Sequence, residues 1–203
     1  GSAAWRLPDL DEYPSINPPY VTPDMAGTWT PFMRNPETGV RYWAKPGMEG
    51  FMHRIGGLEK SSETGAISTE PENHHLMTQL RAEKVAKIAD AIPLLEVEGD
   101  PDADLLIIGF GGTYGHLHSA MDVLNAQGKK AALAHFRFIN PLPKNTEEVL
   151  RRYKNIVVAE QNMGQLAGYL RMKVEGIRLH QFNQVKGQPF VVQELVDAFS
   201  KLF

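Results

Sequence analysis

The sequence contains no cysteine, which excludes disulfides, thiolate nucleophiles and cysteine ligands for zinc or an iron–sulfur cluster. It has no apolar run approaching the roughly 20 residues that cross a bilayer, and no signal peptide is visible. Neither sign of charge is in excess, because 21 Lys and Arg residues stand against 24 Asp and Glu, for a formal net charge of −3. The absence of a basic stripe argues against nucleic acid or an anionic membrane as a partner. We therefore expect a cytoplasmic protein without either partner.

Regular hydrophobic periodicity is also missing from residues 1–68, where most of the 14 prolines lie. The segment contains Trp29, Phe32, Tyr42 and Trp43, and disordered segments are usually poor in such aromatic residues. We expect an irregular arm that docks on a neighbouring surface, with these four residues as candidate subunit-interface residues. Because the chain opens Gly-Ser-Ala-Ala without Met, we expect an excised piece, in which residues 1–68 form an irregular arm or linker.

Strand and helix patterns alternate from Thr69 to the end of the chain. Thr69-Glu70-Pro71-Glu72 has the pattern of a capping box, and Asn145 is placed to cap a short helix. The helix that starts at this capping box is expected to end at Ile92. Further helices are expected from the glycine cluster to Gln127, over Leu166–Val174 and over Val192–Phe199. Expected strands are Leu94–Glu98, Asp104–Phe110, Ala131–Ile139, Asn155–Glu160 and an edge strand over Ile177–Val185. This order predicts an α/β domain over residues 69–203, with a mostly parallel open sheet and helices on both faces.

A glycine cluster follows the apolar strand that begins at Asp104. Gly109, Gly111, Gly112 and Thr113 form a loop before a helix, the place where many α/β proteins bind ligands. The spacing is G-x-G-x-x-x-G instead of the dinucleotide pattern G-x-G-x-x-G, and the expected acidic residue after the next strand is missing. Two interpretations stay open. The loop binds a phosphate or CoA-like group, or its glycines serve the fold, with Gly111 or Gly112 needing a positive φ or close helix packing.

Other candidate chemistry in the domain is sparse. The neighbouring histidine pairs lack metal-ligand spacing, and no G-x-S-x-G elbow is present, so we expect no metal site and no catalytic residue. His135 lies in an apolar strand and is expected to be structural. Glu160 ends the most apolar strand, where Asn162 either caps the next helix or faces a ligand. Leu142, between two prolines, is expected to be exposed and is a candidate docking point.

The order of several segments resembles the α subunits of 2-oxoacid:acceptor (ferredoxin) oxidoreductases, with the 2-oxoglutarate type most similar. The segments that carry the resemblance are Leu106–Gly115, Phe138–Pro143 and Ala159–Leu166, with Pro71-Glu72-Asn73-His74 following Gly57-Leu58-Glu59. The resemblance implies the carboxy-terminal part of such a subunit, with a transketolase C-terminal-like α/β domain. It also implies that residues 1–68 are the tail of a missing preceding domain. No catalytic residue of the family can be placed on this sequence.

The resemblance also implies the chemistry of a larger complex. Such an enzyme decarboxylates a 2-oxoacid on thiamine diphosphate and Mg, forms an acyl-CoA and passes electrons through an iron–sulfur cluster to ferredoxin. We expect this chain to bind none of these cofactors, and to associate with the β subunit that binds thiamine diphosphate. The favoured hypothesis is a non-catalytic assembly domain, inactive alone. The alternatives are a small-molecule binding module using Gly109–Thr113, and an interaction domain of an unrelated α/β family.

Overall fold

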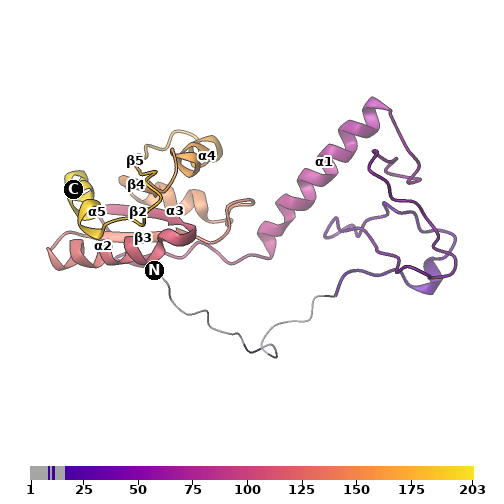
Figure 1. Ribbon diagram of the computed structural model, residues 1–203, viewed down its shortest axis with the longest axis horizontal. Helices are drawn as coiled ribbons and strands as arrows, with labels where there is room; N and C mark the ends of the chain where they lie inside the picture. The colour runs from indigo at the N-terminus through magenta and orange to yellow at the C-terminus, as the bar shows by residue number, and fades with distance from the viewer. Residues whose placement is uncertain (1–8, 10, 12–16) are drawn as a thin grey trace. The chain divides into compact units, whose positions relative to one another are not determined.

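The computed structural model describes residues 9, 11 and 17–203, so the first part of the expected arm lies outside the described residues. Two compact units are present. We call residues 17–91 the arm unit and Ile92–Phe203 the α/β unit, and Figure 1 shows both. The units therefore divide between Ala91 and Ile92, later than the domain boundary expected at residue 68; the domain assignment itself stays a prediction.

The α/β unit is built on one five-stranded sheet with the order β1-β3-β2-β4-β5. The strands are β1 (Glu98–Gly99), β2 (Leu105–Phe110), β3 (Ala131–Phe136), β4 (Asn155–Glu160) and β5 (His180–Asn183). Only β1 runs antiparallel to its neighbour, and β2 to β5 are parallel. The sheet confirms the expected mostly parallel α/β fold, including the edge position of β5.

Helices cover both faces of this sheet, as expected (Figure 1). Helices α2 (Tyr114–Ala126) and α5 (Val192–Phe199) pack on one face, and α3 (Thr146–Arg152) and α4 (Gln165–Lys173) pack on the other. Side chains along β2 alternate between the two cores. Leu105 and Ile107 join the α2 and α5 side, whereas Leu106 and Ile108 join the α3 and α4 side. Because β2 is buried on both faces, its sequence is an unbroken run of apolar residues.

The arm unit consists mainly of turns and of one long helix, α1 (Pro71–Lys87), which continues as a 3-10 turn over Ile88–Asp90. Hydrogen bonds tie α1 to the irregular segment. The Asn73 side chain donates to the Lys60 carbonyl at 2.9 Å, and Lys87 Nζ donates to the carbonyls of Pro36 and Glu37 at 3.1 and 2.8 Å. Met77 is the buried residue of the helix. These contacts explain why α1 belongs to the same compact unit as the arm.

Three local expectations are wrong. Helix α1 begins after Glu70, without a side-chain cap, instead of at a capping box on Thr69. The strand expected over Leu94–Glu98 shrinks to the two residues of β1. Asn145 occupies the N-cap position of α3, but its side chain makes no capping hydrogen bond.

The last two differences share one cause. The Asn145 side-chain amide accepts from the Leu95 N–H at 2.8 Å and donates to the Leu95 carbonyl at 2.9 Å. Asn145 thus occupies the backbone groups through which Leu95 would pair with a strand, and it is not free to cap α3.

Within the described residues, no helix combines the length and apolar character needed to cross a membrane.

The Asn145 side chain should stabilise the α/β unit through these two hydrogen bonds. We expect Asn145→Ala to lower the free energy of unfolding by about 1–3 kcal/mol, because the buried Leu95 would lose a partner for its N–H. Asn183→Ala, at an exposed position of β5, is the matched control and should change it by less than about 0.5 kcal/mol. Urea unfolding of both variants gives the comparison, and equal effects would contradict the role of Asn145.

Candidate functional site

The glycine loop lies where β2 ends and α2 begins, as the sequence predicts. Gly109 is in β2, and Gly111–Thr113 form a 3-10 turn that leads into α2. Ideal Cβ atoms added to these glycines show which of them the fold requires. At Gly109 such an atom would lie 2.2 Å from Leu117 Cδ1 and 2.7 Å from Thr113 Oγ1. The missing Cβ of Gly109 therefore lets α2 and its preceding turn pack directly on the strand.

Backbone conformation accounts for a second glycine of the loop. Gly111 has a φ of +62°, a region that residues with a Cβ rarely adopt. Gly112 has no positive φ, and a Cβ added to it would meet no other atom within 4 Å. Two of the loop glycines thus serve the fold, and Gly112 has no such requirement in this structure.

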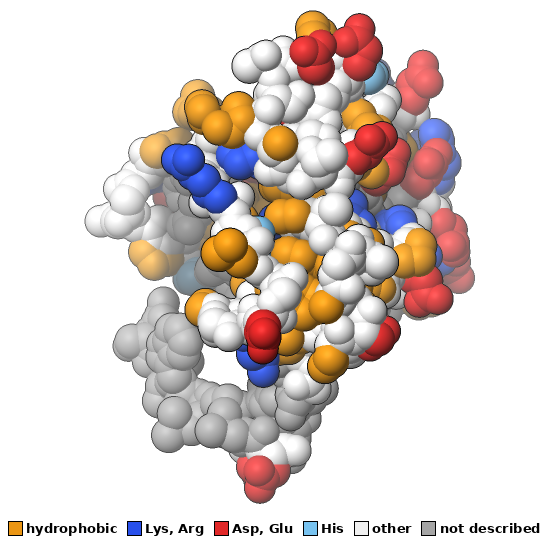
Figure 2. Space-filling view, turned by 90° about the vertical axis from the view of Figure 1, so that its right-hand side faces the viewer, with side chains coloured by type: hydrophobic (Ala, Val, Ile, Leu, Met, Phe, Trp, Pro, Cys, Tyr) orange, Lys and Arg blue, Asp and Glu red, His pale blue; other side chains and the backbone are white. Residues whose placement is uncertain are grey.

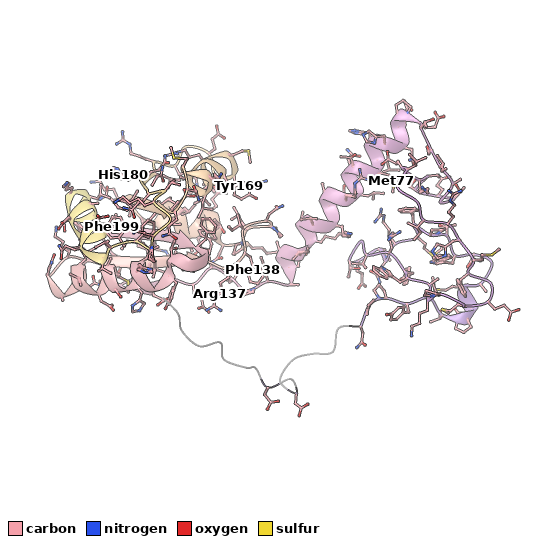
Figure 3. The ribbon with its side chains drawn as sticks, in the orientation of Figure 1. Met77, Arg137, Phe138, Tyr169, His180 and Phe199 are labelled. Carbon is pink, nitrogen blue, oxygen red and sulfur yellow. The ribbon has the colours of Figure 1, made fainter. Side chains whose placement is uncertain are left out.

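A cavity of about 360 Å³ lies next to this loop, at the carboxyl end of β3. Its polar groups come from Tyr114 at the start of α2, from His135 and Arg137, and from the segment before β1. Figure 3 labels Arg137 and Phe138, which follow β3. The lining residues are Pro93, Leu94, Leu95, Glu96, Glu98, Tyr114, His135, Arg137, Phe138 and Pro143.

His135 is half-buried in the cavity wall. Burial lowers its pKa first, and the positive charge of Arg137 lowers it further, against a smaller opposing effect of Glu98. The Thr113 hydroxyl donates its proton to the Phe110 carbonyl at 2.8 Å, and its oxygen lies 3.4 Å from His135 Nε2. Thr113 can therefore only accept from His135, which places the imidazole proton on Nε2. Because its pKa is lowered, His135 is neutral near pH 7, and its structural role stays a prediction.

Tyr114 and Glu98 form a second polar group at the cavity. The Tyr114 hydroxyl donates to Glu98 Oε2 at 2.9 Å, and this bond raises the pKa of Tyr114. His118 Nε2 lies 3.5 Å from the same carboxylate oxygen, while His118 Nδ1 lies 3.1 Å from Asp122. The Tyr114 ring meets the His135 ring edge-on, with centroids 5.3 Å apart. Across the described residues, no three His, Asp or Glu side chains come together as metal ligands do.

The polar end of β4 is used to start α4. Glu160 is fully buried, and its carboxylate accepts from the backbone N–H groups of Leu166 and Ala167 at 2.6 and 2.9 Å. Asn162 accepts from the N–H groups of Gly164 and Gln165 at 2.8 and 2.9 Å. The capping interpretation of Asn162 is therefore confirmed. These acceptors satisfy four donors that a helix start leaves unpaired.

The candidate interface aromatics of the arm unit are only partly covered. The Trp29 indole donates to the Tyr42 carbonyl at 3.2 Å, and Arg41 lies over the Phe32 ring at 4.8 Å. Trp43 leaves 54% of its surface exposed beside a hollow of about 100 Å³. Figure 2 shows hydrophobic side chains gathered in the middle of the face it presents.

Leu142 is not the exposed turn residue that the flanking prolines suggested. It is half-buried and packs against the core cluster on the α3 and α4 side of the sheet. An apolar side chain packed in this way stabilises the turn after β3. Leu142 therefore exposes less surface to a partner than expected. Its candidacy as a docking point remains a prediction.

Comparison with known proteins connects this geometry to a family. Residues 103–195 match the model of the pyruvate:ferredoxin oxidoreductase core domain II. Over 197 residues, 96% of the chain, the sequence is 43% identical to 2-oxoglutarate oxidoreductase subunit KorA of Mycobacterium tuberculosis. The chain belongs to the 2-oxoacid:ferredoxin oxidoreductase α-subunit family. The resemblance to this family is thereby confirmed.

One further relative and one solved structure are also similar to this chain. Subunit alpha of 2-oxoacid:ferredoxin oxidoreductase 2 of Aeropyrum pernix is 29% identical over 153 residues, covering 73% of this chain and 24% of its own. A solved structure of 2-oxoglutarate:ferredoxin oxidoreductase from Magnetococcus marinus, with 2-oxoglutarate, coenzyme A and succinyl-CoA bound, matches with a TM-score of 0.85 at 29% identity. That match covers 96% of this chain and 34% of the other. The chain thus spans about a quarter to a third of the length of these relatives.

The cavity itself was not anticipated from the sequence. Its wall combines residues at or after the carboxyl ends of β2 and β3 with the segment Pro93–Glu98, of which Leu94–Glu98 was expected to be a strand. An indication was present in His135 and Arg137, which are polar residues at the carboxyl end of an apolar strand.

Gly109 should be the glycine of the loop that the fold tolerates least. We expect Gly109→Val to lower the free energy of unfolding by about 1–3 kcal/mol or more, because the new side chain would overpack against the fully buried Leu117. Gly111→Val should cost about 1–3 kcal/mol through its positive φ. Gly112→Ala is the control and should stay within about 0.5 kcal/mol. A Gly109→Val protein that unfolds like the control in a denaturant titration would contradict this packing.

His135 should make stability depend on pH. Its pKa is lower in the folded protein than in the unfolded chain, so the unfolded chain binds a proton first as the pH falls. The neutral imidazole therefore contributes fully to the free energy of unfolding above a pH of about 6.5. This contribution declines as the pH falls toward the pKa that His135 has in the folded protein. We expect His135→Gln to flatten this decline, and Arg137→Gln to reduce it. Denaturant titrations of the three proteins at several pH values test this, and parallel pH profiles would refute it.

Proposed function

We propose that this chain is a non-catalytic, organising part of the α subunit of a 2-oxoglutarate:ferredoxin oxidoreductase. The observation that carries the proposal is the 43% identity to the 2-oxoglutarate oxidoreductase subunit KorA across 96% of the chain. The complete enzyme would oxidatively decarboxylate 2-oxoglutarate, form an acyl-CoA and reduce ferredoxin. The β subunit and ferredoxin are the partners that this proposal requires.

The donor sets of the chain support an organising role. The sequence has no cysteine to hold an iron–sulfur cluster, and the described residues bring together no cluster of acidic or histidine ligands for the Mg of thiamine diphosphate. The residues present therefore do not fit these cofactors, which we assign to other parts of the complex. The buried Glu160 carboxylate, the one charged group inside the core of the α/β unit, is committed to the start of α4.

The arm unit is the part of the chain best suited to docking. Large hydrophobic side chains are exposed at several of its positions, and apolar anchors of this kind dominate the energetics of protein interfaces. The exposed set comprises Tyr20, Trp43, Met52, Ile55, Leu58, Ile67, Leu76 and Ile88. We propose that this set packs against the rest of the oxidoreductase complex and holds the α and β subunits together.

Association of the complete subunits tests the docking role. In a full α subunit co-expressed with its β subunit, the double variant Trp43→Ser and Ile55→Ser should reduce co-purification by at least about tenfold, because two apolar anchors are lost. Met172→Ser is the matched control, since Met172 is an exposed residue of α4 in the α/β unit. The control should assemble like the parent. Normal assembly of the double variant would overturn the docking role.

The chain alone should be catalytically silent. Purified 203-residue protein should give no 2-oxoglutarate- and CoA-dependent reduction of a viologen dye above the blank without enzyme. The sequence has no cysteine for a cluster, and the residues that the structure describes gather no acidic or histidine ligands for Mg. The full complex, assayed in parallel, is the positive control. Turnover by the isolated chain would show that it carries catalytic groups.

One observation keeps a second candidate function open. Gly112 has no structural need for glycine, and a backbone without a Cβ permits the close approach of a phosphate. A binding module for a phosphate or CoA-like group would use this position. CoA should then raise the melting temperature of the parent but not of Gly112→Val, whereas no effect of CoA on either protein would exclude this function.

A further inference from the structure

The cavity beside β3 has opposite charges on its wall and apolar surface between them. Arg137 supplies the positive side, and Glu96 and Glu98 supply the negative side. Leu94 and Phe138 leave 59% and 41% of their surfaces exposed along the same cavity. Its volume of about 360 Å³ lies near the lower end of the range for small-molecule sites, about 300–1,000 Å³.

Arg137 is not neutralised by its own protein. Among the described residues, its guanidinium has no ion pair and no hydrogen bond, although its charge acts on both His135 and Tyr114. Two other arginines of the α/β unit, Arg151 and Arg152, form ion pairs with Glu147 and Glu148. A guanidinium presents a planar fork of donors that fits a carboxylate in a bidentate manner. Arg137 is therefore equipped to receive an acid group.

The two glutamates of the cavity wall differ in whether their carboxylates already have hydrogen-bond partners. Glu98 already accepts from the Tyr114 hydroxyl and lies near His118, which fixes its position. Glu96 has no hydrogen bond or ion pair in the part of the chain that the structure describes. A ligand with a positively charged donor would find Glu96 open and Glu98 held in place. A ligand with several phosphates would meet repulsion from this side of the wall.

We infer that this cavity binds a small zwitterion with an apolar body, namely an α-amino acid with an aromatic or branched aliphatic side chain. The carboxylate pairs with Arg137, and the ammonium group faces Glu96 and Glu98. The apolar side chain lies against Leu94 and Phe138. The neutral His135, with its proton directed at Thr113, adds no second positive charge to the wall.

Calorimetric titration of the 203-residue chain with L-phenylalanine and L-leucine tests this site. We expect saturable one-to-one binding of at least one of them. Phenylpyruvate lacks the ammonium group and phenethylamine lacks the carboxylate, so each should bind at least about tenfold more weakly than L-phenylalanine. Absence of saturable binding of both amino acids up to about 10 mM would overturn the inference.

Variants connect the binding to the proposed contacts. Arg137→Gln should weaken binding of L-phenylalanine by about tenfold and leave that of phenethylamine unchanged, whereas Glu96→Gln should weaken phenethylamine and spare phenylpyruvate. Arg178→Gln, at an exposed arginine outside the cavity, is the control and should bind like the parent. Thermal unfolding verifies that each variant is folded. Equal losses in Arg137→Gln and Arg178→Gln, or binding of CoA in place of the amino acids that depends on Arg137, would contradict the assignment.

Discussion

The burial of β2 on both faces is the constraint on which the α/β unit depends. Its residues Leu105–Ile108 are completely inaccessible, and the strand pairs in parallel with β3 on one side and β4 on the other. The turn after β2 brings α2 directly back onto the sheet, where α2 packs in the same core as Leu105 and Ile107. Gly109 permits that return, because Leu117 and Thr113 occupy the space that a Cβ would take. A motif that resembles a nucleotide loop is thus explained largely by helix packing.

The two compact units divide the properties of the chain between them. In the α/β unit, the polar groups at the strand ends are mostly used internally, as Glu160 and Asn162 are at the start of α4. The arm unit instead leaves hydrophobic side chains uncovered around a single long helix. Interior order in one unit and exposed apolar surface in the other suit a subunit that organises a larger assembly. Arg137 and Glu96 are exceptions, since neither has an ion pair or hydrogen bond among the described residues, and both line the cavity from which the amino-acid site is inferred.

The sequence predicted the fold where hydrophobic periodicity controls the structure. Strands β2 and β4 and helices α2 and α5 follow their apolar patterns closely, since burial of those residues drives their formation. The prediction failed where one side chain serves a distant backbone. Asn145 binds Leu95, 50 positions earlier, and so replaces both a strand and a helix cap with one tertiary contact. Leu142 was misjudged for a similar reason, because its burial depends on a core formed by other elements. The cavity also depends on such long-range placement, which local spacing does not reveal.

Turnover per assembled complex tests the organising role most directly. The measurement compares the full α and β complex carrying the parent sequence with one carrying the arm double variant at Trp43 and Ile55, using light scattering to count assembled complexes. The account predicts that the variant yields fewer complexes and that those that form reduce viologen at the parental rate. Normal assembly with a reduced turnover rate would show that this part of the α subunit contributes to catalysis itself.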